Sequence, residues 1–234
     1  MTIQTVRYLG HSAVFLEGSS GVIAIDPWLS SNPSCPAEYR SPKRIDLIVL
    51  SHGHSDHASD AAQLAKQTGA KIAATFELAC LLQSEGVPSG QLVMMNKGGT
   101  VNMGKLSVSL TQAFHSSSYD TSDGPRYAGE PCGVVVRDGR HSFYHSGDTA
   151  LFSDMTLIGT RYKPSIAFVC IGDVFTMGPS EAAQAVHMLG AKVAVPIHYG
   201  TFPALTGTAE EFALECEQYG IHARVMNPGD SWAL

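Results

Sequence analysis

The sequence predicts an α/β protein in which two β-sheets lie face to face and helices cover their outer faces, giving a four-layer sandwich. Strand-rich segments and helical segments occur in two successive rounds along the 234 residues, and each round places polar residues at the ends of strands. A chain of this length commonly stays undivided, so we expect residues 1–234 to form one domain. A ligand site would then lie along one edge of the paired sheets.

The first round opens with three short apolar or alternating runs, each closed by glycine or proline, which predict strands joined by tight turns. These runs are "TIQTVRYLG", "SAVFLEG" and "GVIAIDPW". The apolar run "IDLIVL" at 45–50 is typical of a strand covered on both faces, and it leads directly into a histidine cluster. We expect Ser59 to be the N-cap of a helix that stops at Gly69, and "KIAAT" to be the next strand.

The rest of the chain continues this alternation. We expect a helix over "FELACLLQSEG", then strands over "QLVMMNKGGTVNMGKLSVSLTQAFH" that end at His115. Residues 116–130 are polar and have the length at which irregular loops tend to be functional, so they are a candidate lid. The second round predicts a hairpin turning at "DGR", a buried strand "PSIAFVCIGD", a helix from Ser180, a strand "KVAVPIHYG", a helix "TAEEFALECEQYG" and a terminal strand pair.

Composition and charge exclude several classes of protein. The formal net charge is −6 and no basic run exceeds "PKR" at 42–44, which argues against a nucleic-acid partner. No segment approaches a membrane span, and the N-terminus lacks the pattern of a signal peptide. The 5 cysteines are widely spaced without CxxC pairing, as in reduced cytoplasmic proteins. We expect a cytoplasmic protein with a small-molecule substrate, and whether it is a homo-oligomer stays open.

The stretch "SHGHSDHASD" places three histidines and an aspartate in six positions. Crowded imidazoles lose solvation and repel one another when protonated, so this pattern indicates a metal site. His52 and His54 flank Gly53, so in an extended loop both imidazoles can face one side while the glycine accepts an unusual backbone angle. Asp56 and His57 follow. A catalytic zinc needs three protein ligands and four are present, so two neighbouring ions explain the stretch better than one.

The sequence resembles the metallo-β-lactamase superfamily, whose signature HxHxDH stands here as "HGHSDH" at 52–57. The resemblance runs nearly end to end, from Asp26 in "GHSAVFLEGSSGVIAIDPWLS" to His115, to Asp148 in "HSGDTALFSDM" and to His198 in "PIHYGTFP". More narrowly, "TQAFHSSSY", "GDTALFSDM" and "FTMGPSEAA" resemble the uncharacterised metal-dependent hydrolases related to ascorbate-6-phosphate lactonases. The resemblance implies the metallo-β-lactamase fold.

The resemblance also implies a centre of two divalent ions. One ion would be held by His52, His54 and His115. The second would be held by Asp56, His57 and His198, with Asp148 bridging both and Asp26 orienting the cluster. Zinc is the first expectation, and manganese, iron or nickel also suit these ligands. A metal-bound hydroxide would attack a lactone or other ester of a small polar metabolite.

Three further positions are candidates for the site. His145 could point into the site or pack beneath it, and the same two placements are possible for His11 in "LGHSAVF". Asp173 closes a predicted buried strand, where a carboxylate needs a partner. We therefore name Asp56, Asp148, His145 and Asp173 as candidate catalytic residues and none of the cysteines.

Two departures leave the substrate open. The related hydrolases commonly read "GDNFTMGP" and "HYNTFP", whereas this chain has Val174 and Gly200 in place of the asparagines. A phosphodiesterase acting on a nucleotide or phospholipid and a non-catalytic metal-binding protein are the alternatives. β-Lactamase action is disfavoured because those enzymes typically have a cysteine at the position of Asp148. Oxygen-reducing di-iron chemistry is disfavoured because the relatives that perform it usually have a glutamate at the position of His54.

Overall fold

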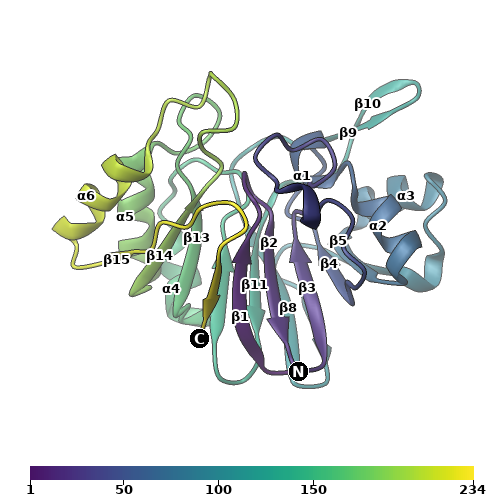
Figure 1. The fold of residues 1–234 in the computed structure, drawn as a ribbon, viewed down its shortest axis with the longest axis horizontal. Coiled ribbons are helices and arrows are strands. Elements are labelled where there is room, and N and C mark those ends of the chain that lie inside the picture. Colours follow the sequence, from purple (N-terminus) through teal and green to yellow (C-terminus); the bar gives the residue numbers. More distant parts are fainter.

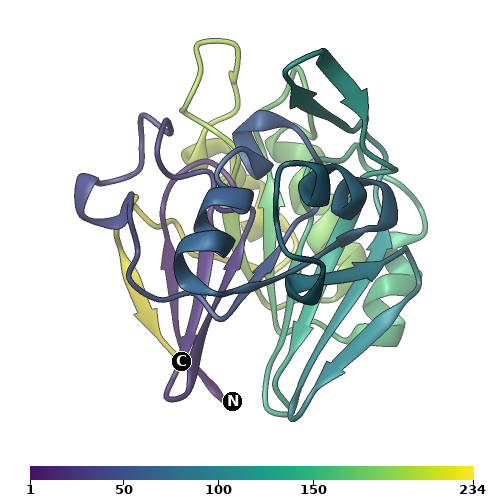
Figure 2. The ribbon, with the colours of Figure 1, turned by 90° about the vertical axis from the view of Figure 1, so that its right-hand side faces the viewer.

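The computed structural model describes residues 1–234, and its strands form two seven-stranded sheets that stack face to face (Figures 1 and 2). The first sheet contains, in spatial order, β16 (Ser231–Ala233), β1 (Ile3–Tyr8), β2 (Val14–Gly18), β3 (Gly21–Ile25), β4 (Leu47–Val49), β5 (Lys71–Thr75) and β6 (Leu92–Met95). The second contains β15 (His222–Ala223), β14 (Val193–Ile197), β13 (Ile166–Cys170), β12 (Ser142–His145), β11 (Cys132–Arg137), β8 (Leu106–Gln112) and β7 (Thr100–Met103).

Both sheets are half antiparallel and half parallel. In the first, β1, β2 and β3 form an antiparallel meander, and β3, β4, β5 and β6 run parallel. In the second, β7, β8, β11 and β12 are antiparallel, and β12, β13, β14 and β15 run parallel. The carboxyl ends of the parallel strands meet at one edge of each sheet, where α/β proteins commonly bind ligands.

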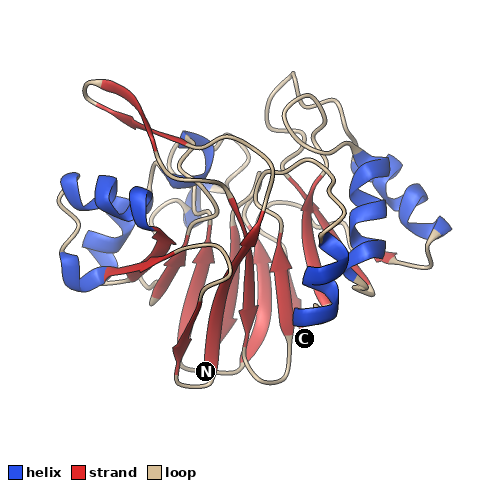
Figure 3. Ribbon diagram, turned by 180° about the vertical axis from the view of Figure 1, so that it is seen from behind, coloured by secondary structure: helices blue, strands red, loops and turns tan.

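Helices cover the two outer faces (Figure 3). The first sheet is covered by α2 (Ala61–Thr68) and α3 (Phe76–Ser84), and the second by α4 (Met155–Tyr162), α5 (Pro179–Leu189) and α6 (Ala209–Gln218). Short turns of helix lie at α1 (Ser55–Ala58), Ala37–Tyr39 and Ser89–Gln91. One apolar cluster fills the space between the sheets and one lies under each helical layer, which confirms the four-layer prediction. None of the helices has the length and hydropathy needed to cross a bilayer.

Several local predictions were wrong. The N-cap of α2 is Asp60 and not Ser59, although the helix does stop at Gly69, which has φ +76°. Helix α4 was not predicted, because its interior glycine and threonines have low helix propensity. Its buried Met155, Ile158 and Tyr162 stabilise it by packing against the second sheet.

The two segments predicted least well are the end of the chain and the candidate lid. The terminal strands do not pair with each other, because β16 joins β1 and β15 joins β14 in the other sheet. The candidate lid is not irregular: β9 (Ser118–Thr121) and β10 (Gly124–Tyr127) form a hairpin that projects from the same end of the molecule as α1 (Figures 1 and 2).

Candidate metal centre

The predicted ligands come together at the edge where the parallel strands end. The histidine cluster follows β4 and continues into α1. His115 follows β8, Asp148 follows β12, and His198 directly follows β14. Four strands from two sheets therefore deliver side chains to one point between the sheets.

One group of ligands consists of His52, His54 and His115, whose ligand atoms all lie within 4.8 Å of one another. His52 Nε2 and His54 Nδ1 are only 3.0 Å apart. Burial lowers the pKa of all three imidazoles, so they are neutral at pH 7 and each has a lone pair available. Three neutral imidazoles that converge in this way suit a divalent cation.

The second group contains Asp56, His57 and His198, together with His11, again within 4.8 Å. Burial, the largest single effect, lowers the pKa of His198, but the charge of Asp148 and the contacts with the Asp148 and Asp56 carboxylates together outweigh it and raise the pKa to about 9. Burial likewise lowers the pKa of His57, but the charges of Asp148 and Asp26 and their contacts with the ring together raise it well above its usual range. Without a cation these two imidazoles carry the positive charge that balances the carboxylates.

Asp148 touches both groups. Its Oδ2 lies 3.0 Å from His198 Nε2 and 3.6 Å from His115 Nε2, and its Oδ1 lies 3.3 Å from His57 Nε2. Three of these buried atoms, Asp148 Oδ1, His57 Nε2 and His198 Nε2, nevertheless have no hydrogen-bond partner. Leaving buried polar atoms unpaired costs about 1–3 kcal/mol each. The residues present therefore fit metal ions, which would satisfy these atoms.

A buried aspartate orients two of the histidines. Asp26 accepts hydrogen bonds from Ser51 N (2.8 Å), from Ser51 Oγ (2.6 Å) and from His57 Nδ1 (2.8 Å). Because the Ser51 hydroxyl donates to Asp26, it accepts from His52 Nδ1 at 2.9 Å. Both histidines therefore keep a proton on Nδ1 and turn Nε2 toward the centre. Nε2 is free in the neutral His52, and in His57 a cation would displace the second proton from it.

Comparison with known proteins agrees with this geometry. The sequence profile of the beta-lactamase superfamily domain matches residues 22–199, a range that contains every predicted ligand. The chain belongs to this superfamily. A UPF0173 metal-dependent hydrolase of Rubrobacter xylanophilus is 45% identical over 230 residues, covering 96% of this chain and 94% of that protein. One of Myxococcus xanthus is 46% identical over 235 residues, covering 98% and 83%.

A solved structure of another metallo hydrolase also matches this chain. Igni18, a metallo hydrolase from the hyperthermophilic archaeon Ignicoccus hospitalis, is 36% identical with a TM-score of 0.87, and the match covers 100% of this chain and 99% of that one. The present protein is therefore a metal-dependent hydrolase of the beta-lactamase superfamily with the metallo-β-lactamase fold.

The backbone of this hydrolase is strained at its metal centre. His11, Asp26 and His198 have φ angles of +54°, +45° and +57°, in the left-handed region that non-glycine residues seldom adopt. The His198 N–H donates to the His11 carbonyl at 2.7 Å, which ties two of these residues together. Strain of this kind persists only where the surrounding contacts hold it, and it concentrates at functional sites.

His11, which the sequence left undecided, lies inside the centre. Its Nε2 is 3.0 Å from Asp56 Oδ2 and its Nδ1 is 3.0 Å from Thr201 Oγ1. Burial lowers the pKa of His11 to about 4, so the ring is neutral at pH 7. The contact restrains the half-buried carboxylate of Asp56. The only sequence signal was "GH" at the end of a strand, where the chain turns sharply.

Two candidate catalytic residues lie elsewhere. His145 is fully buried beneath the centre, where its Nε2 bonds the Ser12 carbonyl at 2.9 Å and its Nδ1 accepts from Gly147 N at 3.1 Å. Asp173 does not end a buried strand; it is exposed in the loop after β13, and its carboxylate accepts from Thr206 Oγ1 at 3.2 Å. Neither side chain lines the cavity at the metal ligands.

Gly53 was expected to adopt an unusual backbone angle. The structure instead requires a glycine here because there is no space for a side chain. Gly53 has no positive φ. A Cβ there would lie 2.7 Å from Ala128 Cβ and 2.8 Å from the Ser118 carbonyl oxygen. The ligand loop thus packs directly against the base of the β9–β10 hairpin.

We expect Gly53→Ala to lower the free energy of unfolding by about 1–3 kcal/mol, because the added methyl group overfills a packed contact. Denaturant unfolding of the metal-free protein measures this. Gly90→Ala is the matched control, since a Cβ at this exposed glycine meets nothing within 4 Å. Equal free energies of unfolding for the two variants would show that the β9–β10 hairpin shifts to accommodate the methyl group.

Proposed function

We propose that the protein holds two divalent metal ions and hydrolyses a lactone or another carboxylic ester of a small metabolite. The observation that carries the proposal is the position of Asp148, whose carboxylate contacts His115 of one ligand group and both His57 and His198 of the other. A carboxylate shared in this way is what a bridging ligand requires. Zinc suits the histidine-rich set, and manganese, iron and nickel are compatible with it.

When bound, a pair of such ions lowers the pKa of a coordinated water molecule and polarises the substrate carbonyl. The protein's own part is to hold the ligands in position. Asp26 and Ser51 fix the tautomers of His52 and His57, and His11 restrains Asp56. The rigid placement of charged groups in a partly buried site lets them stabilise developing negative charge without rearrangement.

The cysteines support this reading because they offer no competing nucleophile. Burial raises the pKa of Cys132 to about 12 and that of Cys170 to about 11, so neither forms a thiolate at neutral pH. Cys80 is exposed on α3, on the outer face of the first sheet. Hydrolysis would therefore depend on the metal centre.

Metal content by elemental analysis tests the proposal first. We expect about two ions per chain after purification without chelator, and a loss of metal in the His54→Ala, Asp148→Ala double variant. The loaded protein is then assayed against lactones, aryl esters and a phosphodiester. Cleavage of the phosphodiester alone would favour the nucleotide or phospholipid alternative, and full metal occupancy with no turnover would favour a non-catalytic metal-binding protein.

Uptake of the two ions should differ in its dependence on pH. His52, His54 and His115 have lowered pKa values and are ready to bind at pH 7. His57, whose pKa lies well above its usual range, and His198, with a pKa of about 9, must each first lose a proton. Affinity for the second ion should therefore rise by up to about a hundredfold per pH unit between about pH 6 and 9.

Titration calorimetry in buffers of different ionisation enthalpy should count at least one proton released with the second ion. The first ion provides the internal control, because its binding should release none above about pH 7. Two ions with the same dependence on pH would contradict the assignment of His198.

A further inference from the structure

The cavity beside the metal centre has aromatic walls. Its volume is about 260 Å³, and metal ligands form its floor together with Ser116. Phe175, from the loop after β13, and Phe202, from the loop after β14, complete the lining. This volume is below the lower end of about 300 Å³ for pockets that hold drug-sized ligands, so the substrate is small.

Phe202 is held firmly in place. Its ring stacks on Trp28 with centroids 5.8 Å apart and meets His11 edge-on at 5.5 Å. Trp28 is itself buried and donates from Nε1 to Ser31 Oγ at 2.6 Å. One wall of the cavity is therefore preorganised.

Phe175, unlike the buried Trp28, is 57% exposed. The preceding Asp173 and Val174 have φ angles of +61° and +46°, a costly backbone conformation that presents Val174 and Phe175 outward. An exposed phenyl ring at the rim of a catalytic cavity gains contact when an apolar group covers it.

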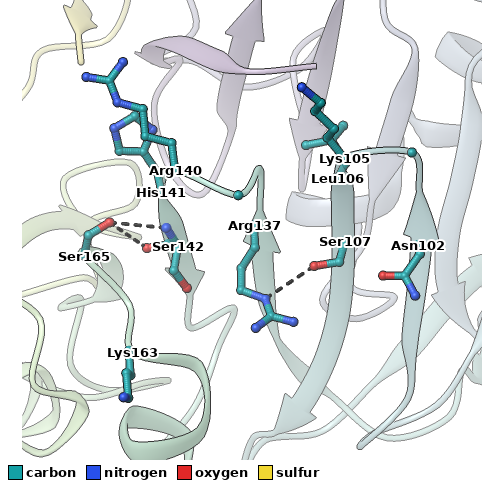
Figure 4. Close-up of a pocket in the computed structure, with 12 residues that line it drawn as sticks. Asn102, Lys105, Leu106, Ser107, Arg137, Arg140, His141, Ser142, Lys163 and Ser165 are labelled. Carbon is teal, nitrogen blue, oxygen red and sulfur yellow. Dashed lines mark hydrogen bonds between the residues drawn. The ribbon is translucent and has the colours of Figure 1, made fainter.

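The cavity contains no lysine or arginine, whereas four basic side chains line a groove at the other end of the sheets. There Lys105, Arg137, Arg140 and Lys163 line a groove of about 400 Å³ at the starts of β8, β12 and β13. Figure 4 shows that these four side chains extend in different directions and do not converge on one point. The catalytic cavity therefore has no lysine or arginine to hold a phosphate or carboxylate group, and the charge of His198 is already balanced by the neighbouring Asp148 and Asp56.

We infer that the substrate carries an uncharged aryl or alkyl group next to its scissile bond, and that Phe175 and Phe202 enclose this group. The inference rests on the proposed esterase or lactonase function. It replaces the expectation of a polar metabolite, because a charged substituent lying against the two phenyl rings would lose its hydration with no lysine or arginine in the lining to compensate it. Val174, which stands where related hydrolases have an asparagine, agrees with a cavity rim that offers few hydrogen bonds.

Lactones with one variable substituent test the inference by turnover. The zinc-loaded protein is given γ-butyrolactones that carry a phenyl, a hydroxymethyl or a carboxylate group at the same carbon, and each rate is divided by the rate with hydroxide alone. We expect kcat/KM for the phenyl lactone to exceed the other two by about tenfold or more. Equal or greater kcat/KM for the hydroxymethyl or carboxylate lactone would overturn the inference and leave the hydrolase assignment standing.

Binding of the matching lactams to the metal-free protein provides a readout without turnover. We expect 5-phenyl-2-pyrrolidinone to bind about tenfold more tightly than the hydroxymethyl and carboxylate lactams. If the phenyl lactam binds as expected but no lactone is hydrolysed, the cavity assignment holds and the proposed reaction fails. If the three lactams bind equally, the inference fails whatever the turnover.

Substitutions then assign the effect to the aromatic walls. Phe175→Ala should reduce the preference for the phenyl lactam about tenfold, and Phe175→Lys should reverse it in favour of the carboxylate. The matched control is Phe76→Ala on α3, which removes a phenyl ring that is 54% exposed and lies outside the cavity. A preference unaltered in both Phe175 variants would contradict the assignment.

Discussion

Asp148→Asn is expected to lower kcat/KM for every ester or lactone that the protein hydrolyses by about two to three orders of magnitude. The carboxylate is the one anion that contacts ligands of both groups, and its pKa is held well below the usual range by His198 and His57 despite its burial. Asparagine keeps the volume but removes the charge and places an amide N–H against a histidine ligand. Steady-state kinetics with saturating metal measures the loss.

Asp173→Asn is the control for this variant. The same change of charge is made at an exposed position whose carboxylate contacts Thr206, and asparagine tolerates the left-handed backbone there. We expect kcat/KM within about twofold of the parent, as for most surface substitutions. A large loss in this variant, or retained activity in Asp148→Asn, would contradict the assignment of the centre.

Asp26→Asn is expected to weaken metal binding about 10- to 100-fold and to lower the free energy of unfolding by about 1–3 kcal/mol. Asp26 Oδ2 accepts from both Ser51 Oγ and His57 Nδ1, and an amide nitrogen in that position would leave one donor unpaired in a fully buried place. An amide oxygen there would instead place the N–H₂ group against Ser51 N. Competition with a fluorescent chelator measures the affinity, and denaturant unfolding of the metal-free protein measures the stability.

Asp46→Asn is the matched comparison. Asp46 also accepts a backbone N–H, from Val22 at 2.8 Å, but it is exposed and its other partner is Arg44. Surface ion pairs contribute about 0–1 kcal/mol, so its loss should scarcely change stability and should leave metal affinity unaltered. If Asp26→Asn behaves in the same way, Asp26 does not orient the ligands.

The strands and most helices could be predicted because their signals are local. Alternating or continuous apolar runs identify β1 to β5, and a left-handed glycine does end α2. Helix α4 and the separate destinations of β15 and β16 could not be predicted in this way. Their stability comes from surfaces contributed by distant parts of the chain, which local propensity does not contain.

The residues of the metal centre also divide into those that could be predicted from sequence and those that only the tertiary structure identifies. The sequence by itself determined the hexapeptide at 52–57, because residues adjacent in the chain stay adjacent in space, and the resemblance supplied Asp26, His115, Asp148 and His198. The tertiary structure decided which other polar side chains share the site. Asp56 meets His11, 45 positions away, whereas His145, close in sequence to Asp148, turns beneath the centre.

The nature of the substrate cavity also depended on the tertiary structure alone. Phe175 and Phe202 lie in loops after different strands, and neither belongs to a pattern that marks a binding wall. A metal ligand is recognisable in sequence because few residue types can bind an ion. The wall of an apolar cavity consists of residue types that usually pack in the hydrophobic core. Only the tertiary structure therefore shows that these two phenyl rings face the catalytic cavity instead.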